Sequence, residues 1–377
     1  MGSSTRPGIR AGAALGLVCT LLAATALPAQ PVIAQTSSPF SVTQQDKPTS
    51  TLTPQAVLEA YDAKDYITAM VIGKFVASDG DANTQALLGY MLEHGQGGDV
   101  DITEAISWYK KAAAQGQTDA MVALGELALA GQGGLSRTGA LSWFTKAAKV
   151  DRTDAMLALA RLYDGGKGIL PNPAEARSWR IKAANLGDAQ AARELGDDSF
   201  DTNSVEALKW YEKAAALGDI DSAYIAAIMY AENYEIKPNN ARMTELLAQA
   251  AQAGHPAAMA DYGLLVYQGN GVERSAEQAA LWFEKSAHAG DPEGRFLYAY
   301  TLAKGDGIAQ DFEEAYYWLL RAESDTPTTL GTSSDYDKDR TELKRRLEDN
   351  VASEILTRAR KRVASENLFS GQNTTGP

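Results

Sequence analysis

Small and large apolar residues recur along the chain in a pattern that repeats about every 36 residues. In most cycles an alanine stands early in a first segment, and in every cycle a glycine or alanine follows five residues after that position. A second segment then carries alanine, a large aromatic residue, lysine and an Ala-Ala pair, as in residues 104–116 (EAISWYKKAAAQG). Glycine closes most of these second segments, and it adopts the left-handed conformation that ends helices without a Cβ penalty. The pattern predicts antiparallel helix pairs in tandem.

All tryptophans stand at one position of this pattern, with spacings of 35, 36, 31, 72 and 36 residues. The gap of 72 contains one further unit, in which Leu246 takes the tryptophan position. Seven units therefore extend from about residue 82 to residue 322. The tryptophans are Trp108, Trp143, Trp179, Trp210, Trp282 and Trp318.

The small residue of each first segment predicts how the two helices of a pair meet. Glycine and alanine let two helix backbones approach closely, and we expect each tryptophan to fill the space between one pair and the next. One pair cannot bury its apolar face alone, so neighbouring pairs must stack. The small residues are Gly89, Gly125, Ala160, Gly196, Ala227, Gly263 and Ala299.

These features together resemble the Sel-one-like repeat, a relative of the tetratricopeptide repeat. The period of about 36 and a Gly-x-Gly turn between the helices, such as Gly95-Gln96-Gly97, favour it over the 34-residue tetratricopeptide type. The resemblance covers residues 82–322 as seven repeats and implies an all-α fold, a right-handed α-solenoid of antiparallel helix pairs. Residues 53–81 are interpreted as an N-terminal half-repeat. The unit at 220–255 departs from the pattern, because it lacks both its tryptophan and its glycine turn.

The two ends of the chain differ from the repeats. Residues 1–34 have the features of a signal peptide: a basic start, the apolar run 11–27, and small residues up to Ala34, after which we expect cleavage. An uncleaved anchor and lipidation at Cys19 are the alternatives. Residues 35–52, rich in Ser, Thr, Gln and Pro, predict a flexible linker.

After the repeats we expect a loop at 323–337, a C-terminal capping helix or helices at 338–366, and a disordered tail at 367–377. The capping segment is basic whereas the body is acidic. We therefore expect the cap to dock on the body, although contact with an anionic surface is an alternative.

Charge and cysteine content limit the possible partners and chemistry. The net charge of −13 argues against nucleic acid, whose binding depends on neutralising phosphates. The single cysteine lies in the signal peptide, so the processed chain would have neither disulfide nor thiol chemistry. No stretch after residue 34 is long and apolar enough to span a membrane. We expect a periplasmic or secreted protein without cofactors.

No residue set in the sequence predicts catalysis or metal binding. His94, His255 and His288 belong to different units and lack metal-ligand spacing. The Gly-x-Gly turns follow helices, whereas a dinucleotide loop follows a strand, and no G-x-S-x-G motif is present. We expect no catalytic, cofactor-binding or metal-binding residues and no enzymatic activity. A hydrolase is the remote alternative, because some relatives have been linked to hydrolysis of cell-wall-directed drugs.

The resemblance implies that the first helix of each unit lines a concave groove in which partners bind. Tyrosines concentrate in the C-terminal half of the repeats and suit recognition, because they give contact area at low entropic cost. The residues expected in the groove are Tyr90, Glu93, Glu126, Leu129, Arg161, Asp164, Arg193, Asp197, Leu264, Tyr267, Phe296, Tyr300 and Lys304.

The function that the resemblance implies is a scaffold or adaptor. Exported members of the family include regulators of sensor kinases and of exopolysaccharide production. We therefore expect protein partners in the cell envelope. A polysaccharide- or peptidoglycan-binding module of envelope assembly is the alternative.

Overall fold

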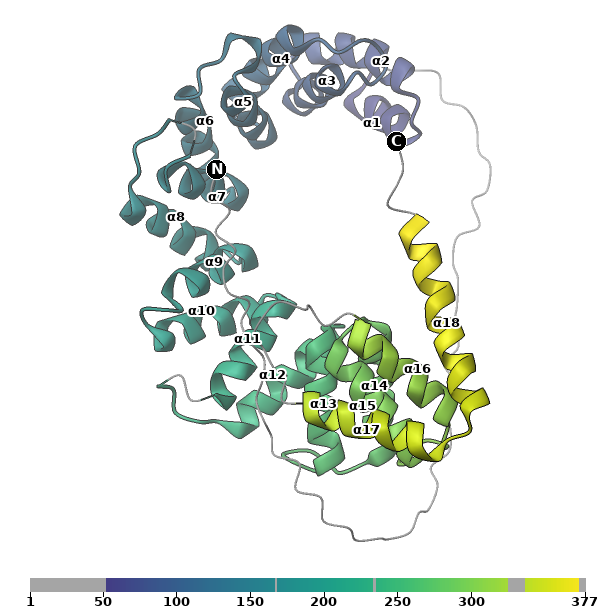
Figure 1. The fold of residues 1–377 in the computed structure, drawn as a ribbon. Coiled ribbons are helices and arrows are strands. Elements are labelled where there is room, and N and C mark those ends of the chain that lie inside the picture. The colour runs from purple at the N-terminus through teal and green to yellow at the C-terminus, as the bar shows by residue number, and fades with distance from the viewer. Residues whose placement is uncertain (1–51, 167, 233–234, 325–335, 373–377) are drawn as a thin grey trace. The chain divides into compact units, whose positions relative to one another are not determined.

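The computed structural model describes residues 52–166, 168–232, 235–324 and 336–372 (Figure 1). These residues form eighteen α-helices and one short 3-10 helix, and no strand is present among them. Adjacent helices pair throughout, which confirms the predicted all-α solenoid of helix pairs. The predicted signal peptide and all but the last residue of the predicted linker lie outside the described residues. None of the described helices combines the length and the apolar character that a membrane span needs.

The chain divides into two compact units at residues 183 and 184, within α8. The helices of the N-terminal unit are α1 (Pro54–Asp62), α2 (Tyr66–Ser78), α3 (Ala82–His94), α4 (Ile102–Ala114), α5 (Thr118–Ala130), η1 (Gln132–Gly134), α6 (Gly139–Ala148), α7 (Thr153–Tyr163) and α8 (Pro173–Asn185).

The C-terminal unit contains the remaining helices. They are α9 (Ala189–Ser199), α10 (Ser204–Ala216), α11 (Ile220–Ala231), α12 (Asn240–Gln252), α13 (Pro256–Gln268), α14 (Ala276–His288), α15 (Pro292–Lys304), α16 (Phe312–Ser324), α17 (Asp337–Asn350) and α18 (Ser353–Gln372).

Short polar side chains begin the helices and glycines end them. The Asp101 carboxylate accepts a hydrogen bond from the Glu104 amide at 2.8 Å, which satisfies one of the free N–H groups at the start of α4. Gly95 ends α3 with φ of 66°, and Gly305 ends α15 with φ of 71°. Asp151 takes the same left-handed region, with φ of 63°, where other units have glycine. The predicted turns are confirmed at these positions.

Each helix pair closes around the residue that follows the tryptophan position. Phe144 and Tyr211 are each 1% exposed. The Phe144 ring lies so close to α5 that a Cβ on Gly125 would stand 2.6 Å from its Cε1 atom. Glycine therefore allows the ring to enter between the helices.

The size of this small residue matches its partner in every unit. Four units place glycine opposite an aromatic ring, and in each the ring would clash with a Cβ. These pairs are Gly89 with Tyr109, Gly125 with Phe144, Gly196 with Tyr211, and Gly263 with Phe283. The other three units have alanine in the first helix and a non-aromatic residue at the second position. Those residues are Ala160 and Arg180, Ala227 and Leu247, and Ala299 and Leu319.

The tryptophans contribute less to the core than the sequence pattern predicts. Trp108 and Trp318 are buried, with 9% and 5% exposure, but the other four are part-exposed. Trp282 packs against the apolar clusters of two neighbouring pairs, as expected. In five units the lysine three residues later covers the ring, and the Lys111 Nζ lies 3.7 Å from the Trp108 ring centroid. The tryptophan therefore packs partly against the core and partly against its own helix.

The two ends also differ from their predictions. Residues 53–81 form two helices, so this segment is a complete pair in place of a half-repeat. The cap consists of two helices, and α18 continues to Gln372, so the tail predicted from residue 367 is wrong at its start. The cap docks on α16, where Arg358 Nε donates to Glu313 at 2.7 Å and the Arg362 guanidinium lies 3.7 Å from the Tyr317 ring centroid.

Candidate functional site

The first helices of the repeats carry the predicted binding residues, and we call their outward side chains the first-helix face. In the N-terminal unit this face includes Tyr90, which is 40% exposed. Its ring stacks on His94, with the centroids 4.1 Å apart. The His94 Nδ1–H donates to the Tyr90 carbonyl oxygen at 3.0 Å, which holds the two rings together.

Carboxylates follow the same face across α3, α5 and α7. Glu93 accepts a hydrogen bond from the Tyr109 hydroxyl at 2.7 Å. Burial, and then the nearby charges of Glu93 and Asp154, raise the pKa of Glu126. Glu126 therefore lies close enough to be repelled by both Glu93 and Asp154, and Asp154 is itself paired with the Arg152 guanidinium.

The remaining predicted residues of this unit differ in their exposure to solvent. Leu129 is part-buried, whereas Arg161 and Asp164 are exposed. The Asp164 carboxylate pairs with the Arg180 guanidinium from α8, so part of its charge is neutralised within the repeat. The predicted groove residues thus include groups that are already engaged within the chain.

The C-terminal unit begins its first-helix face with two further engaged groups. Arg193 Nη1 donates to the Asp221 carboxylate at 2.9 Å and links α9 to α11. Asp197 accepts a hydrogen bond from the Tyr211 hydroxyl at 2.8 Å. Tyr109 and Tyr211 therefore play the same part, because each ring fills a glycine gap while its hydroxyl fixes a carboxylate on the first-helix face.

Two predicted groove residues lie in the core. Leu264 and Phe296 are each 4% exposed, so the prediction that they contact a partner is wrong. Helix α15 buries consecutive residues from 294 to 299, because neighbours pack on several of its sides. One of these neighbours is Tyr336, whose ring centroid lies 5.5 Å from that of Phe296 and which precedes α17.

A tyrosine–lysine–aspartate cluster joins α13 to α15. The Tyr267 hydroxyl donates to the Asp306 carboxylate at 2.7 Å. Lys304 Nζ donates to the Tyr267 hydroxyl at 2.9 Å and to Asp306 at 2.8 Å. These two hydrogen bonds raise the pKa of Lys304, which keeps it cationic. Lys304 also lies 5.8 Å from the ring centroid of the part-exposed Tyr300. The structure therefore brings together Tyr267, Tyr300 and Lys304, three of the residues expected in the groove.

A second cluster, between α11 and α13, was not found from the sequence. The Tyr224 ring stacks on His255 at 4.3 Å, and its hydroxyl donates to the Asp261 carboxylate at 3.0 Å. Burial raises the pKa of Asp261 to about 7. Tyr224 and Asp261 stand 37 residues apart, about one repeat, which is the only signal in the sequence that could have paired them.

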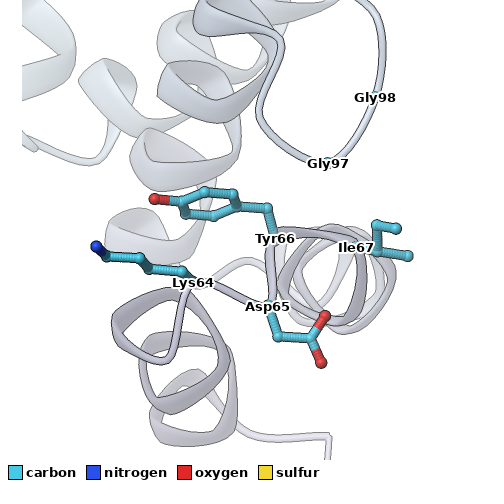
Figure 2. A pocket seen from close by; sticks show the side chains of 6 residues that line it. All are labelled: Lys64, Asp65, Tyr66, Ile67, Gly97 and Gly98. Atoms are coloured by element: carbon cyan, nitrogen blue, oxygen red, sulfur yellow. The ribbon is translucent and has the colours of Figure 1, made fainter.

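A hollow is present outside the first-helix face. It lies at the turn between α1 and α2, has a volume of about 510 Å³, and is lined by Lys64, Asp65, Tyr66, Ile67, Gly97 and Gly98 (Figure 2). Across the described ranges, no three His, Cys, Asp or Glu side chains gather in a way that could hold a metal ion. The first-helix face and this hollow therefore offer aromatic rings and charged groups to a partner.

Comparison with known families agrees with this architecture. The Sel1 repeat model matches residues 82–117, 118–150, 153–188, 190–219, 256–291 and 292–324, which together make up more than half of the chain. The chain belongs to the Sel1 repeat family. The unit at 220–255 is not matched, although α11 and α12 form a helix pair there. Proteins of this family are generally non-catalytic, and their repeat solenoid is an interaction scaffold.

Solved structures include similar chains. A Sel1 repeat protein from Oxalobacter formigenes is 27% identical, with a TM-score of 0.52 over 73% of this chain and 87% of that one. A protective antigen of uropathogenic Escherichia coli with the same type of fold is 22% identical, with a TM-score of 0.44 over 86% of this chain and 80% of that one. No curated protein matches the chain.

Proposed function

We propose that this Sel1 repeat protein is an exported, periplasmic scaffold that binds partner proteins through its first-helix face and acts in envelope signalling or exopolysaccharide production. The repeat family supports the scaffold role. The features of a signal peptide in residues 1–34 support export.

The observation that carries the proposal is that hydrogen bonds hold the polar side chains of the first-helix face in fixed positions. Tyr267, Lys304 and Asp306 hold one another by three hydrogen bonds of 2.7 to 2.9 Å. Side chains that are already fixed lose less entropy when a partner binds, so more of the contact energy is retained. The adjoining Tyr300 ring offers the kind of aromatic surface that is enriched at interaction hot spots.

A comparative pull-down tests the proposal. The parent protein and a Tyr300→Ala/Lys304→Ala variant serve as baits in a periplasmic extract, and captured proteins are quantified by mass spectrometry. The matched control is Glu277→Ala/Lys285→Ala, which removes exposed side chains from the second helix α14.

We expect specific proteins to be retained by the parent and the control and lost by the Tyr300→Ala/Lys304→Ala variant. Equal retention by all three baits would contradict binding through this face. Retention of glycan without protein would instead support the polysaccharide-binding alternative.

A further inference from the structure

Helix α2 exposes a stripe of large apolar side chains to solvent. Ile67, Val71 and Phe75 are 70%, 56% and 58% exposed, and they follow one another at a spacing of four residues. Residues four apart lie on one face of a helix. We call these three residues the α2 stripe. A continuous exposed apolar patch is uncommon on a soluble protein and marks an interaction site.

The repeat itself does not require this stripe to be apolar. Ile72 precedes Trp108 by 36 residues, one repeat, so α2 corresponds to the second helix α4. The positions in α4 that correspond to the α2 stripe hold Thr103, Ser107 and Lys111, all of them exposed and polar. The apolar character is therefore particular to the first pair.

In the last pair, the same three positions dock a helix. They are Glu313, Tyr317 and Arg321 of α16, and α18 covers them. Arg358 donates to Glu313 at 2.7 Å, and the Tyr317 hydroxyl and Arg321 Nη1 donate to Glu366 at 2.7 and 3.2 Å. This side of a second helix can thus receive another helix, and polar positions receive a polar partner.

We propose that the α2 stripe binds the α2 stripe of a second copy of this chain, so that two antiparallel α2 helices form a symmetric dimer. Among the described residues, no other helix has three exposed large apolar side chains at a spacing of four, so the matching surface on this chain is the stripe itself.

Charge also favours a second copy at this place. Helix α2 contains no acidic residue between Asp65 and Asp79, and its only charged residue is Lys74, in a chain with a net charge of −13. Two copies can approach here without placing carboxylates of α2 itself opposite one another, and the nearby Glu104 of α4 is paired with Lys74 at 3.5 Å. In a two-fold contact of this kind the same residues meet on both sides, and the central Val71 lies near the axis.

The available area predicts a weak dimer. The α2 stripe adjoins the hollow that Ile67 and the 97–98 turn line (Figure 2). Three exposed side chains per copy, with the rim of this hollow, make a small contact by comparison with the roughly 1,200–2,000 Å² that stable interfaces bury. We therefore expect weak, reversible association.

A single engineered thiol tests the contact directly. The only natural cysteine is Cys19, so a Cys19→Ser background of the full chain contains no thiol. Val71→Cys in this background places one thiol per chain near the proposed axis. Ser107→Cys, at the same position one repeat later, is the matched control. Under mild oxidation we expect a disulfide-linked dimer of Val71→Cys and little of Ser107→Cys.

Sedimentation velocity supplies the second arm. We expect the parent to be a reversible dimer and Val71→Lys to be monomeric, with Ser107→Lys dimerising like the parent. Circular-dichroism melting verifies that the exposed substitutions leave the fold intact. A monomeric parent at all concentrations would overturn the proposal, and so would a Val71→Lys variant that associates as the parent does. Binding of the stripe to residues 35–51 or to a different protein would produce the first of these results.

Discussion

The match between glycine and aromatic rings predicts a strong coupling between Gly125 of α5 and Phe144 of α6. Replacing Gly125 alone with alanine has two opposing effects. Alanine is favoured over glycine within a helix by about 0.5–1 kcal/mol. However, its Cβ would stand 2.6 and 2.7 Å from two atoms of the Phe144 ring, which is only 1% exposed and cannot move into solvent. Overpacking of this kind costs about 1–3 kcal/mol. We expect a net destabilisation of about 1–2 kcal/mol.

Replacing Phe144 alone with leucine leaves a gap beside Gly125. The loss should be roughly 1–2 kcal/mol, because full truncation of a buried Phe costs about 3–5 kcal/mol and leucine refills part of the space. The double variant Gly125→Ala/Phe144→Leu recreates the pairing of Ala227 with Leu247. Its alanine no longer meets a ring, so it should be no less stable than Phe144→Leu alone.

The double-mutant cycle formed by the parent, the two single variants and the double variant therefore predicts a coupling free energy of about 1–3 kcal/mol. This lies in the range seen for residues in contact. Chemical denaturation followed by circular dichroism measures the four free energies of unfolding. Hydrogen exchange on α5 and α6 checks that the effect is local, since repeat arrays can unfold in parts. Additivity within about 0.5 kcal/mol, or stabilisation by Gly125→Ala alone, would refute the reasoning.

Three further predictions concern the core, the buried carboxyl and export. Tyr211→Ala should lower the free energy of unfolding by about 3–5 kcal/mol, whereas Trp210→Ala, at a part-exposed position, should lower it by about 1–2 kcal/mol. Equal losses in denaturation curves would contradict the assignment of the tyrosine to the gap beside Gly196. Asp261→Asn should raise the melting temperature above pH 7 and less so at pH 5. Burial raises the pKa of Asp261 to about 7, so its favourable contribution is complete below the unfolded pKa near 4 and is lost as the pH rises through 7. The gain in the free energy of unfolding is at most about 4 kcal/mol, and it is smaller because the carboxyl is part-exposed. A pH-independent difference in melting temperature would be inconsistent with this cause. The mature protein in a periplasmic fraction should begin at Gln35 by N-terminal sequencing, and recovery of the intact chain from the cytoplasm would argue against export.

Much of the fold was predictable because the same pattern of residues recurs in several successive repeats. The glycine turns, the small residues of the first helices and the pairing of neighbours all followed from residues that recur in register. The size match between Gly196 and Tyr211, and between Ala227 and Leu247, was also present in the sequence. However, the larger tryptophan was expected to fill the core, whereas the residue that follows it does so. Tryptophan can lie half-exposed under a lysine, so its size alone does not place it in the core.

The candidate site was harder to predict, because its exposure depends on residues far along the chain. Phe296 is buried in part by Tyr336, which belongs to no repeat. Asp261 has a raised pKa because the packed helices around Tyr224 shield much of it from solvent, and no pattern near Asp261 in the sequence indicates this. By contrast, Tyr267 and Lys304 were both expected on the first helices from the register of consecutive units, but the hydrogen bond between them was not predicted.

The binding role of the first-helix face is tested most directly by a photo-crosslinking residue in place of Tyr300, introduced in living cells. The same residue at Glu277, on the second helix α14, is the control. We predict crosslinks from position 300 to one or a few defined proteins, identified by mass spectrometry, and few from position 277. Crosslinks to glycan alone, or the same products from both positions, would contradict the account.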